Sequence, residues 1–326
     1  FYRDTHYGEL WVGRRYTLSE AQTRYQIPTR KVTELKNFLT GTPALLMRGG
    51  DRMVDAVVAV HPREEEFVIF TSEHRLIKDD YEIREMQLAV DATGFGFNDV
   101  ILTLPAAAEH PRGERIVEGA FFGRARLEGH GVGYNTIAAS GSHACVLHWT
   151  RNDGAVNHGD LILIDAGIEV DSFYTADITR TLPISGKFSP AQRALYMLVY
   201  EAQLAGFAAV KPGAIFSDIN KASHAVLAKG LADMGVLTAS AEESMRPEVG
   251  LHRRWTLHGV SHHLGLDVHD CAKARKENYT DAVLREGMIL TVEPGLYIQP
   301  DDELFTPEYR GIGIRIEDDV LVTADG

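Results

Sequence analysis

The chain has little cysteine, no long apolar run and a deficit of positive charge. Its only two cysteines, Cys145 and Cys271, cannot form a disulfide framework or a cysteine-rich zinc site. No uncharged apolar stretch approaches the roughly 18 residues needed to cross a bilayer, because Glu201 and Gln203 interrupt the longest one. Lys and Arg total 33 against 46 Asp and Glu, a net charge of −13. We therefore expect neither nucleic acid nor a membrane surface as a partner.

The start of the chain also lacks familiar signals. It opens on Phe1-Tyr2-Arg3-Asp4 instead of Met, so we expect that further N-terminal sequence precedes it. A charged segment followed by an apolar stretch, as in a secretory signal peptide, is absent from these first residues. Together with the sparse cysteines, this predicts a cytoplasmic protein.

The composition suits a globular protein of about two domains. Hydrophobic residues make up 44% of the 326, which is enough for a large core. Residues 1–75 alternate apolar bursts, such as 44–47 and 56–60, with polar stretches, and this predicts a small α/β unit. From 77 to 104 the apolar spacing predicts a long amphipathic helix closed by Pro105. We place a domain boundary near residue 75, which gives domains 1–75 and 76–326.

The second domain mixes predicted strands and helices. An apolar run at 160–165 predicts a buried strand, and 173–182 predicts a second. Ser189-Pro190 predicts the start of a helix that ends near Lys211, and Ser217 is expected to cap another that ends near Gly235. Alternating residues in 287–298 and 309–323 predict further strands. The fold class is therefore mixed α/β.

Two acids stand at the ends of predicted neighbouring strands. Asp165 ends the run 160–165, and Asp177 follows twelve residues later, before Ile178-Thr179-Arg180-Thr181. That interval allows a strand, a turn and a returning strand, so both carboxylates can converge on one point. Each acid taken alone has a structural interpretation, Asp165 as a turn acid and Asp177 as the ion-pair partner of Arg180.

Histidines and two further acids follow in separate blocks. Four histidines fall within twelve residues, interleaved with glycine and small side chains: His258, His262, His263 and His269. Such a cluster favours a metal or proton-transfer site over core histidines. Glu293 ends an apolar strand before Pro294-Gly295, and Glu317 shares a strand face with Arg315. A strand-edge charge and a salt bridge to Arg315 are the structural alternatives for these two acids.

Taken together, these residues describe a metal site. The predicted ligands are four carboxylates and one imidazole: Asp165, Asp177, His262, Glu293 and Glu317. Four negative ligands match two divalent cations, and oxygen-rich ligation favours Mn²⁺ over a thiolate-bound zinc. Two such ions about 3.5–4 Å apart can share a bridging water and convert it to hydroxide at neutral pH. This is machinery for the hydrolysis of an amide bond.

The order of the motifs resembles the pita-bread metallopeptidases, and within them the aminopeptidase P family. The motifs are Asp-Ala-Gly at 165, Asp-Ile-Thr-Arg-Thr at 177, His-Gly-Val-Ser-His-His-Leu-Gly at 258, Glu-Pro-Gly-Leu-Tyr at 293 and Arg-Ile-Glu-Asp at 315. The resemblance covers residue 75 to the end and implies a pita-bread catalytic domain behind a truncated N-terminal α/β domain. It implies that Asp165 binds one metal, that Asp177 and Glu317 bridge both, and that His262 and Glu293 complete the second.

The resemblance also implies roles around the substrate. His148 matches a histidine near the scissile bond and the leaving group, and His258 matches one that hydrogen-bonds the substrate carbonyl. His269 and Arg315 match the proline side of the pocket, which Tyr297 could help to frame. Glu293 is the expected proton carrier. The implied activity is removal of the first residue from peptides with proline in second position, by a homodimer or homotetramer with two divalent ions, most readily Mn²⁺, with Zn²⁺ or Co²⁺ as alternatives.

The sequence departs from the family pattern at one place, and several alternative functions stay open. The interval from Asp165 to Asp177 is one residue longer than in many family members, which a small bulge can absorb. A prolidase, which cuts only Xaa-Pro dipeptides, would have the same metal site. A methionine aminopeptidase usually lacks an extra N-terminal domain such as residues 1–75. A metal-free pita-bread binding module, or a creatinase-type enzyme, has lost ligands that are all present here.

Overall fold

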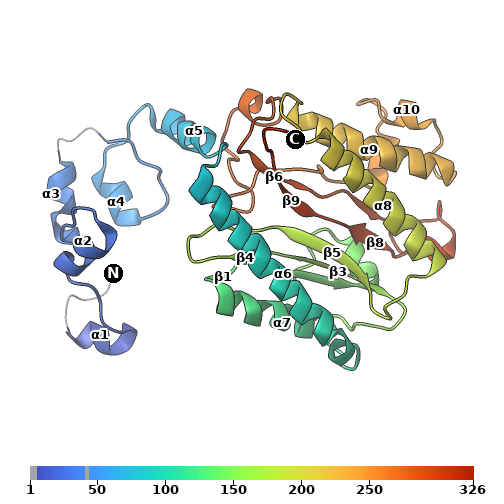
Figure 1. Cartoon of the computed structure of the whole chain (residues 1–326), viewed down its shortest axis with the longest axis horizontal. Helices are drawn as coiled ribbons and strands as arrows, with labels where there is room; N and C mark the ends of the chain where they lie inside the picture. Colours follow the sequence, from blue (N-terminus) through green and yellow to red (C-terminus); the bar gives the residue numbers. More distant parts are fainter. Residues whose placement is uncertain (1–5, 41–43) are drawn as a thin grey trace. The chain divides into compact units, whose positions relative to one another are not determined.

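The computed structural model describes residues 6–40 and 44–326 (Figure 1). The chain divides into two compact units, Phe1–Ile69 and Phe70–Gly326. The division falls within helix α5 (Glu64–His74). The domain boundary near residue 75 lies close to it and stays a prediction. In the described ranges, none of the helices is both long enough and apolar enough to cross a membrane.

The described part of the first unit is helical. Its elements are α1 (His6–Val12), α2 (Leu18–Tyr25), η1 (Val32–Glu34), α3 (Leu35–Leu39) and α4 (Arg52–Val57), followed by the start of α5. The strands of the expected α/β unit are absent from these described residues: of the two apolar bursts, 44–47 is irregular, and Ala56 and Val57 end α4. None of residues 8–40 and 44–69 is buried. The apolar bursts therefore have no sheet or core to join.

The second unit contains two pairs of packed helices. The first pair is α6 (Asp80–Ala108) and α7 (Gly113–Glu128). Asp79 caps α6, and Glu82 bonds back to the Asp79 backbone N–H, which fixes the start of the helix. Pro105 does not close α6 as expected, because the helix continues to Ala108. Only one turn follows the proline, so the lost hydrogen bond falls near the frayed end.

The second pair is α8 (Pro190–Ala209) and α9 (Phe216–Asp233), with the short α10 (Ala241–Ser244) beside α9. Ser189 caps α8 with proline at the first position, as predicted. Ser217 does not cap α9; it lies within the helix, which begins one residue earlier. At this start the N-cap residue is Ile215, and the Asp218 carboxylate at the third helical position accepts the Ile215 backbone N–H.

Short antiparallel strands form four small sheets. These are β1 (Gly131–Val132) with β4 (Ile168–Glu169), β2 (Ile137–Ser140) with β3 (Leu161–Ala166) and β5 (Ile178–Pro183), β6 (Ile289–Val292) with β9 (Asp318–Leu321), and β7 (Gly295–Tyr297) with β8 (Gly313–Arg315). The second unit also contains four 3₁₀ turns: η2 (Gly141–Cys145), η3 (Leu251–Arg254), η4 (Lys276–Asn278) and η5 (Pro307–Tyr309). The strands predicted at 160–165, 287–298 and 309–323 are confirmed.

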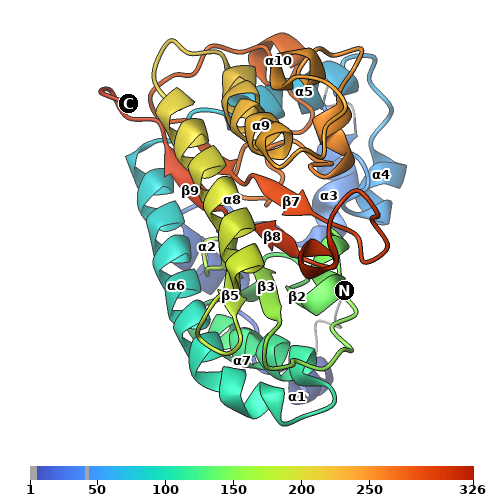
Figure 2. The same ribbon diagram turned by 90° about the vertical axis from the view of Figure 1, so that its right-hand side faces the viewer.

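Strand β3 is buried on both faces and carries Asp165 near its end. Ile162 and Ile164 pack in the cluster that contains α6 and α7, whereas Leu161 and Leu163 pack on the opposite side. Because side chains alternate along a strand, Asp165 shares the face of Leu163. On this side α8 packs against β6, β7 and β8 (Figure 2). A bridge between Thr179 and Glu317 joins the β3–β5 sheet to the later strands.

Candidate metal centre

A cavity of about 560 Å³ opens where these sheets meet. Nine of the ten predicted site residues line it: His148, Asp165, Asp177, His258, His262, His269, Glu293, Arg315 and Glu317. The tenth, Tyr297, is buried behind the wall and is 1% exposed. Residues separated by as many as 169 positions in the chain, from 148 to 317, thus meet at one place.

The hairpin β3–β5 delivers the two aspartates. Its register is continuous from Leu161↔Pro183 to Ala166↔Ile178, and Asp177 stands just before β5. The chain turns at its tip, where Phe173 donates its N–H to the Val170 carbonyl and adopts a left-handed φ of +71°. This turn lies several residues along the chain from both aspartates, and the bulge expected to absorb the extra residue stays a prediction.

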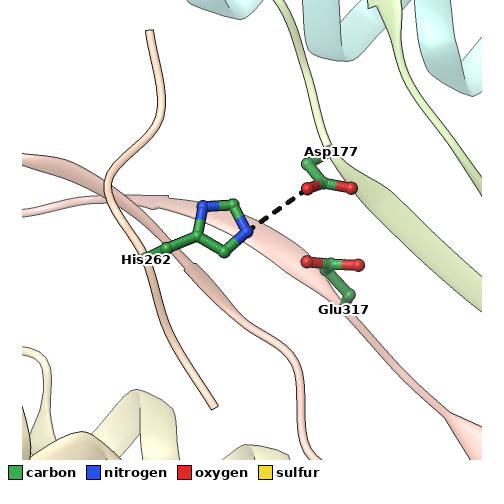
Figure 3. Close-up of side chains that lie close together, drawn as sticks. All are labelled: Asp177, His262 and Glu317. Atoms are coloured by element: carbon green, nitrogen blue, oxygen red, sulfur yellow. Dashed lines mark ion pairs between the residues drawn. The ribbon is translucent and has the colours of Figure 1, made fainter. Parts of the chain in front are cut away.

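Three of the predicted ligands form a tight group. The ligand atoms of Asp177, His262 and Glu317 all lie within 4.8 Å of one another (Figure 3). His262 Nε2 is 3.4 Å from Asp177 Oδ2 and 3.7 Å from Glu293 Oε1. Glu317 Oε2 accepts the Thr179 hydroxyl at 2.6 Å, whereas its Oε1 is buried without a hydrogen-bond partner. A buried carboxylate oxygen with no donor is a natural ligand for a cation.

Asp165 lies beside this group and is held by two other side chains. Arg315 Nη2 donates to its Oδ2 at 2.6 Å, and the Tyr134 hydroxyl contacts its Oδ1 at 2.7 Å. The same hydroxyl lies 2.5 Å from Asp177 Oδ1. A phenol has one proton to donate, so it cannot fully satisfy both aspartates at once. Tyr134 was not among the predicted residues, because a tyrosine after a two-residue strand carries no pattern that points to a metal site.

The crowded acids disturb one another's ionisation. Burial and the charges of neighbouring acids raise the pKa of Glu317 well above its usual range. Burial likewise raises the pKa of Glu293 to about 8, although His262 and Arg315 oppose the shift. Burial lowers the pKa of His262, but Asp177 and Glu293 outweigh it and raise that pKa to about 9. Arg315 and a protonated His262 do not neutralise four carboxylates, three of them buried, and divalent cations bound among them would.

These residues fit a pair of divalent cations on two counts. The donor set is four carboxylates and one imidazole, which is the ligand chemistry of hard cations. In addition, Glu317 Oε1 and Asp319 Oδ1 are buried acceptors with no donor. Asp319 stands directly behind the site, since its Oδ2 accepts the backbone N–H of Asp177 at 3.1 Å. Asp319 thus supports the site from behind, and it was not among the predicted ligands.

His258 is oriented by a chain of hydrogen bonds. Arg315 Nη1 donates to the Tyr297 hydroxyl at 2.9 Å, so that hydroxyl is free to donate to His258 Nε2 at 2.7 Å. His258 Nδ1 then donates to the Gly259 carbonyl. Burial and the positive charge of Arg315 lower the pKa of His258 to about 4, so its imidazole is neutral. Tyr297 thus acts on the cavity through His258.

The remaining histidines divide between the cavity and the core. His269 meets the His262 ring edge-to-face at 4.6 Å, inside the cavity. His148 lies on an exposed loop at the cavity wall. His263 is fully buried away from the cavity, where it stacks against Phe216 at 5.2 Å.

Comparison with known proteins settles the family. The model of metallopeptidase family M24 matches residues 84–324. The chain belongs to this family. Xaa-Pro aminopeptidase 1 of Streptomyces coelicolor is 54% identical over 325 residues, which are 98% of this chain and 65% of that protein. The chain thus spans just under two thirds of the length of this relative. The Xaa-Pro aminopeptidase of Haemophilus influenzae is 35% identical over 98% of this chain and 74% of its own.

Solved structures agree with the sequence relatives. Zinc-substituted aminopeptidase P of Escherichia coli, in complex with product, superimposes with a TM-score of 0.87 at 32% identity, over 100% of this chain and 76% of that one. Aminopeptidase PepP of Pseudomonas aeruginosa gives 0.85 at 32%, over 99% and 76%. The predicted resemblance to aminopeptidase P and the pita-bread fold class are confirmed. M24 membership also implies divalent metal ions.

Proposed function

We propose that this chain carries the active site of an Xaa-Pro aminopeptidase, a metal-dependent hydrolase that removes the first residue of a peptide whose second residue is proline. The observation that carries the proposal is the convergence of four carboxylates and one imidazole in a single cavity. The names of the M24 relatives supply the substrate class, since several are Xaa-Pro aminopeptidases.

The metal ligands are assigned from the geometry and the motifs. Asp165 would hold one ion, Asp177 and Glu317 would be shared by both, and His262 with Glu293 would complete the second. Mn²⁺ is the preferred ion because oxygen ligands predominate, and Zn²⁺ or Co²⁺ would fit the same donors. Bound ions supply Lewis-acid activation of a water and of the scissile carbonyl.

The protein's own groups handle the substrate and the protons. Glu293 accepts a proton from the attacking water and returns it toward the proline nitrogen. His258 Nδ1 lies 3.5 Å from Glu293 Oε2 and bonds to the Gly259 carbonyl. In the proposed mechanism it exchanges that bond for one to the substrate carbonyl. His148, on the cavity wall, contacts the leaving group. Because the bond before proline has no N–H, His269 and Arg315 must recognise the ring by shape.

Several parts of this proposal concern the whole protein. Peptides with proline in second position are the proposed partners, and a homodimer or homotetramer and a cytoplasmic location stay predictions. A prolidase has the same metal site and differs in the space beyond the proline. The test below separates the two activities.

The test offers Mn²⁺-loaded protein an Xaa-Pro-Yaa tripeptide and an Xaa-Pro dipeptide, with products identified by mass spectrometry. We expect release of the first residue from the tripeptide and its loss in Asp177→Asn. The matched control is Asp171→Asn, which changes an acid in the same hairpin whose side chain is 89% exposed, and which should keep full activity. Cleavage of the dipeptide alone would reassign the protein as a prolidase. Failure to cleave either peptide and to bind Mn²⁺ would refute the enzymatic proposal for this chain.

A further inference from the structure

A second buried carboxylate lies outside the metal centre. Glu114 belongs to the first turn of α7, and its side chain is 0% exposed. Its Oε1 accepts the backbone N–H of Ser140 and lies 2.8 Å from His143 Nδ1. Its Oε2 accepts Trp149 Nε1 at 2.9 Å and the backbone N–H of Gly154 at 2.7 Å. Each carboxylate oxygen therefore has two partners.

All four partners come from one segment, residues 140–154, which links β2 to β3. Apart from Ser140, which ends β2, and η2, the segment has no helix or strand, so few backbone hydrogen bonds of its own hold it. His148 lies in this segment, directly before Trp149. The Trp149 indole stacks on the His143 ring with centroids 3.9 Å apart and planes 24° apart. One side chain thus fastens the segment at its start, at its end and beside His148.

The side chains around Glu114 are tightly packed. A Cβ added at Gly154 would lie 2.6 Å from His143 Cε1 and 2.9 Å from Glu114 Oε2, so the cluster has no room for a side chain there. On the other side of His148, Cys145 Sγ bonds to the Ile298 carbonyl, and Gln299 Nε2 bonds to the Cys145 carbonyl. His148 therefore lies between two residues, Cys145 and Trp149, that hydrogen bonds hold in place.

The chemistry of the four partners requires an anion. Backbone and indole N–H groups only donate, and His143 Nδ1 faces an oxygen, so it carries a proton as well. A carboxylate has acceptor sites for all four donors. A glutamine of the same shape would turn an NH₂ group toward two N–H donors and leave them unsatisfied, which is costly in a buried place.

We propose that Glu114 is a positioning residue for His148, which it acts on by fixing segment 140–154 through four charge-assisted hydrogen bonds. This inference rests on the proposed function, because it assigns His148 to the leaving group. It predicts that loss of the carboxylate displaces His148 and leaves the metal ligands in place.

The first test is a double-mutant cycle on the cleavage of the tripeptide. Since small misplacements of an active-site group cost about 10–100-fold, we expect Glu114→Gln to lower kcat by that factor with little change in KM and full Mn²⁺ content. In a His148→Ala background the same change should cost nothing further. Glu109→Gln, at an exposed acid just before α7, is the matched control. An equal loss in both backgrounds would show that Glu114 does not act through His148.

A second measurement does not depend on activity. Hydrogen–deuterium exchange should rise within 140–154 of Glu114→Gln and stay unchanged in β3. If the unsubstituted protein does not cleave proline peptides, the proposed function fails, and exchange alone then decides whether Glu114 fixes the segment. If Glu114→Gln does not fold, Trp149→Phe removes one donor and keeps the ring stack, and it should give a smaller loss of the same kind. Unchanged exchange in the folded variants would overturn the inference.

Discussion

Acid should destabilise this protein through a buried histidine pair behind His258. His224 of α9 is 3% exposed, and its Nδ1 lies 3.1 Å from Nε2 of His252. His252 Nδ1 lies 3.0 Å from the Ser244 carbonyl, so it donates there and its Nε2 must accept from His224. Burial, the neighbouring His252 and the positive charge of Arg253 lower the pKa of His224 from 6.5 to about 4.

The sign and size of the effect follow from that shift. The unfolded chain takes up a proton near pH 6.5 and the folded chain does so only near 4, so the stability is complete above 6.5 and is lost as the pH falls toward 4. Between about pH 7.5 and pH 5 this histidine removes about 2 kcal/mol from the free energy of unfolding. His224→Asn keeps a donor toward His252 and removes the titrating ring.

Urea denaturation at the two pH values measures the prediction. We expect the loss of unfolding free energy between them to be smaller by about 2 kcal/mol in His224→Asn than in the unsubstituted protein. His158→Asn, at an exposed histidine, should change nothing. Equal acid sensitivity in all three proteins would refute the reasoning, because it would mean that His224 does not resist protonation in the folded state.

Three further predictions concern packing and the metal centre. Gly94→Ala should raise the free energy of unfolding by about 0.5–1 kcal/mol, because nothing lies within 4 Å of the added Cβ. Gly96→Ala on the same helix places the added Cβ 2.5 Å from the Phe121 ring and should lower the free energy of unfolding by about 1–3 kcal/mol. Melting temperatures of the two variants that move in the same direction would contradict this prediction. Arg315→Met should destabilise the metal-free protein by about 3–5 kcal/mol, since Asp165 loses its buried partner. Urea titration should show a smaller loss of stability when Mn²⁺ is bound, and an equal loss with and without Mn²⁺ would refute this. Mn²⁺ at about 100 times its Kd should stabilise the protein against urea by about 2.7 kcal/mol, EDTA should reverse this, and a similar gain in Asp177→Asn would argue against the assigned ligand.

The sequence was informative where chemistry and local pattern coincide. Asp165 and Glu293 each end an apolar strand beside a glycine or a Pro-Gly turn, so their placement over a cavity could be predicted from adjacent residues. Tyr134 and Glu114 could not, because their roles arise from partners 31 to 43 and 26 to 40 positions away in the chain. No short-range pattern marks such contacts.

Local structure failed where a competing interaction was present. Ser217 has the residue type of a helix cap, yet the helix starts before it, where Asp218 bonds back to the Ile215 backbone N–H. Pro105 was expected to end α6, but a helix tolerates proline when only one more turn follows. In the first unit, the apolar bursts at 44–47 and 56–60 have the composition of strands, and strands need partners that the described residues do not offer.

The bridge between Thr179 and Glu317 joins two halves of the second unit, and the proposed active site lies at the boundary between them. Asp165 and Asp177 come from the half built on α6 and α7, whereas His262, Glu293 and Glu317 come from the half that packs with α8 and α9. A slight parting of the halves would separate the acids while every helix stays folded. Peptidase activity should therefore disappear at a lower urea concentration than the helical circular dichroism signal. Loss of activity would then detect separation of the two halves before the helices unfold.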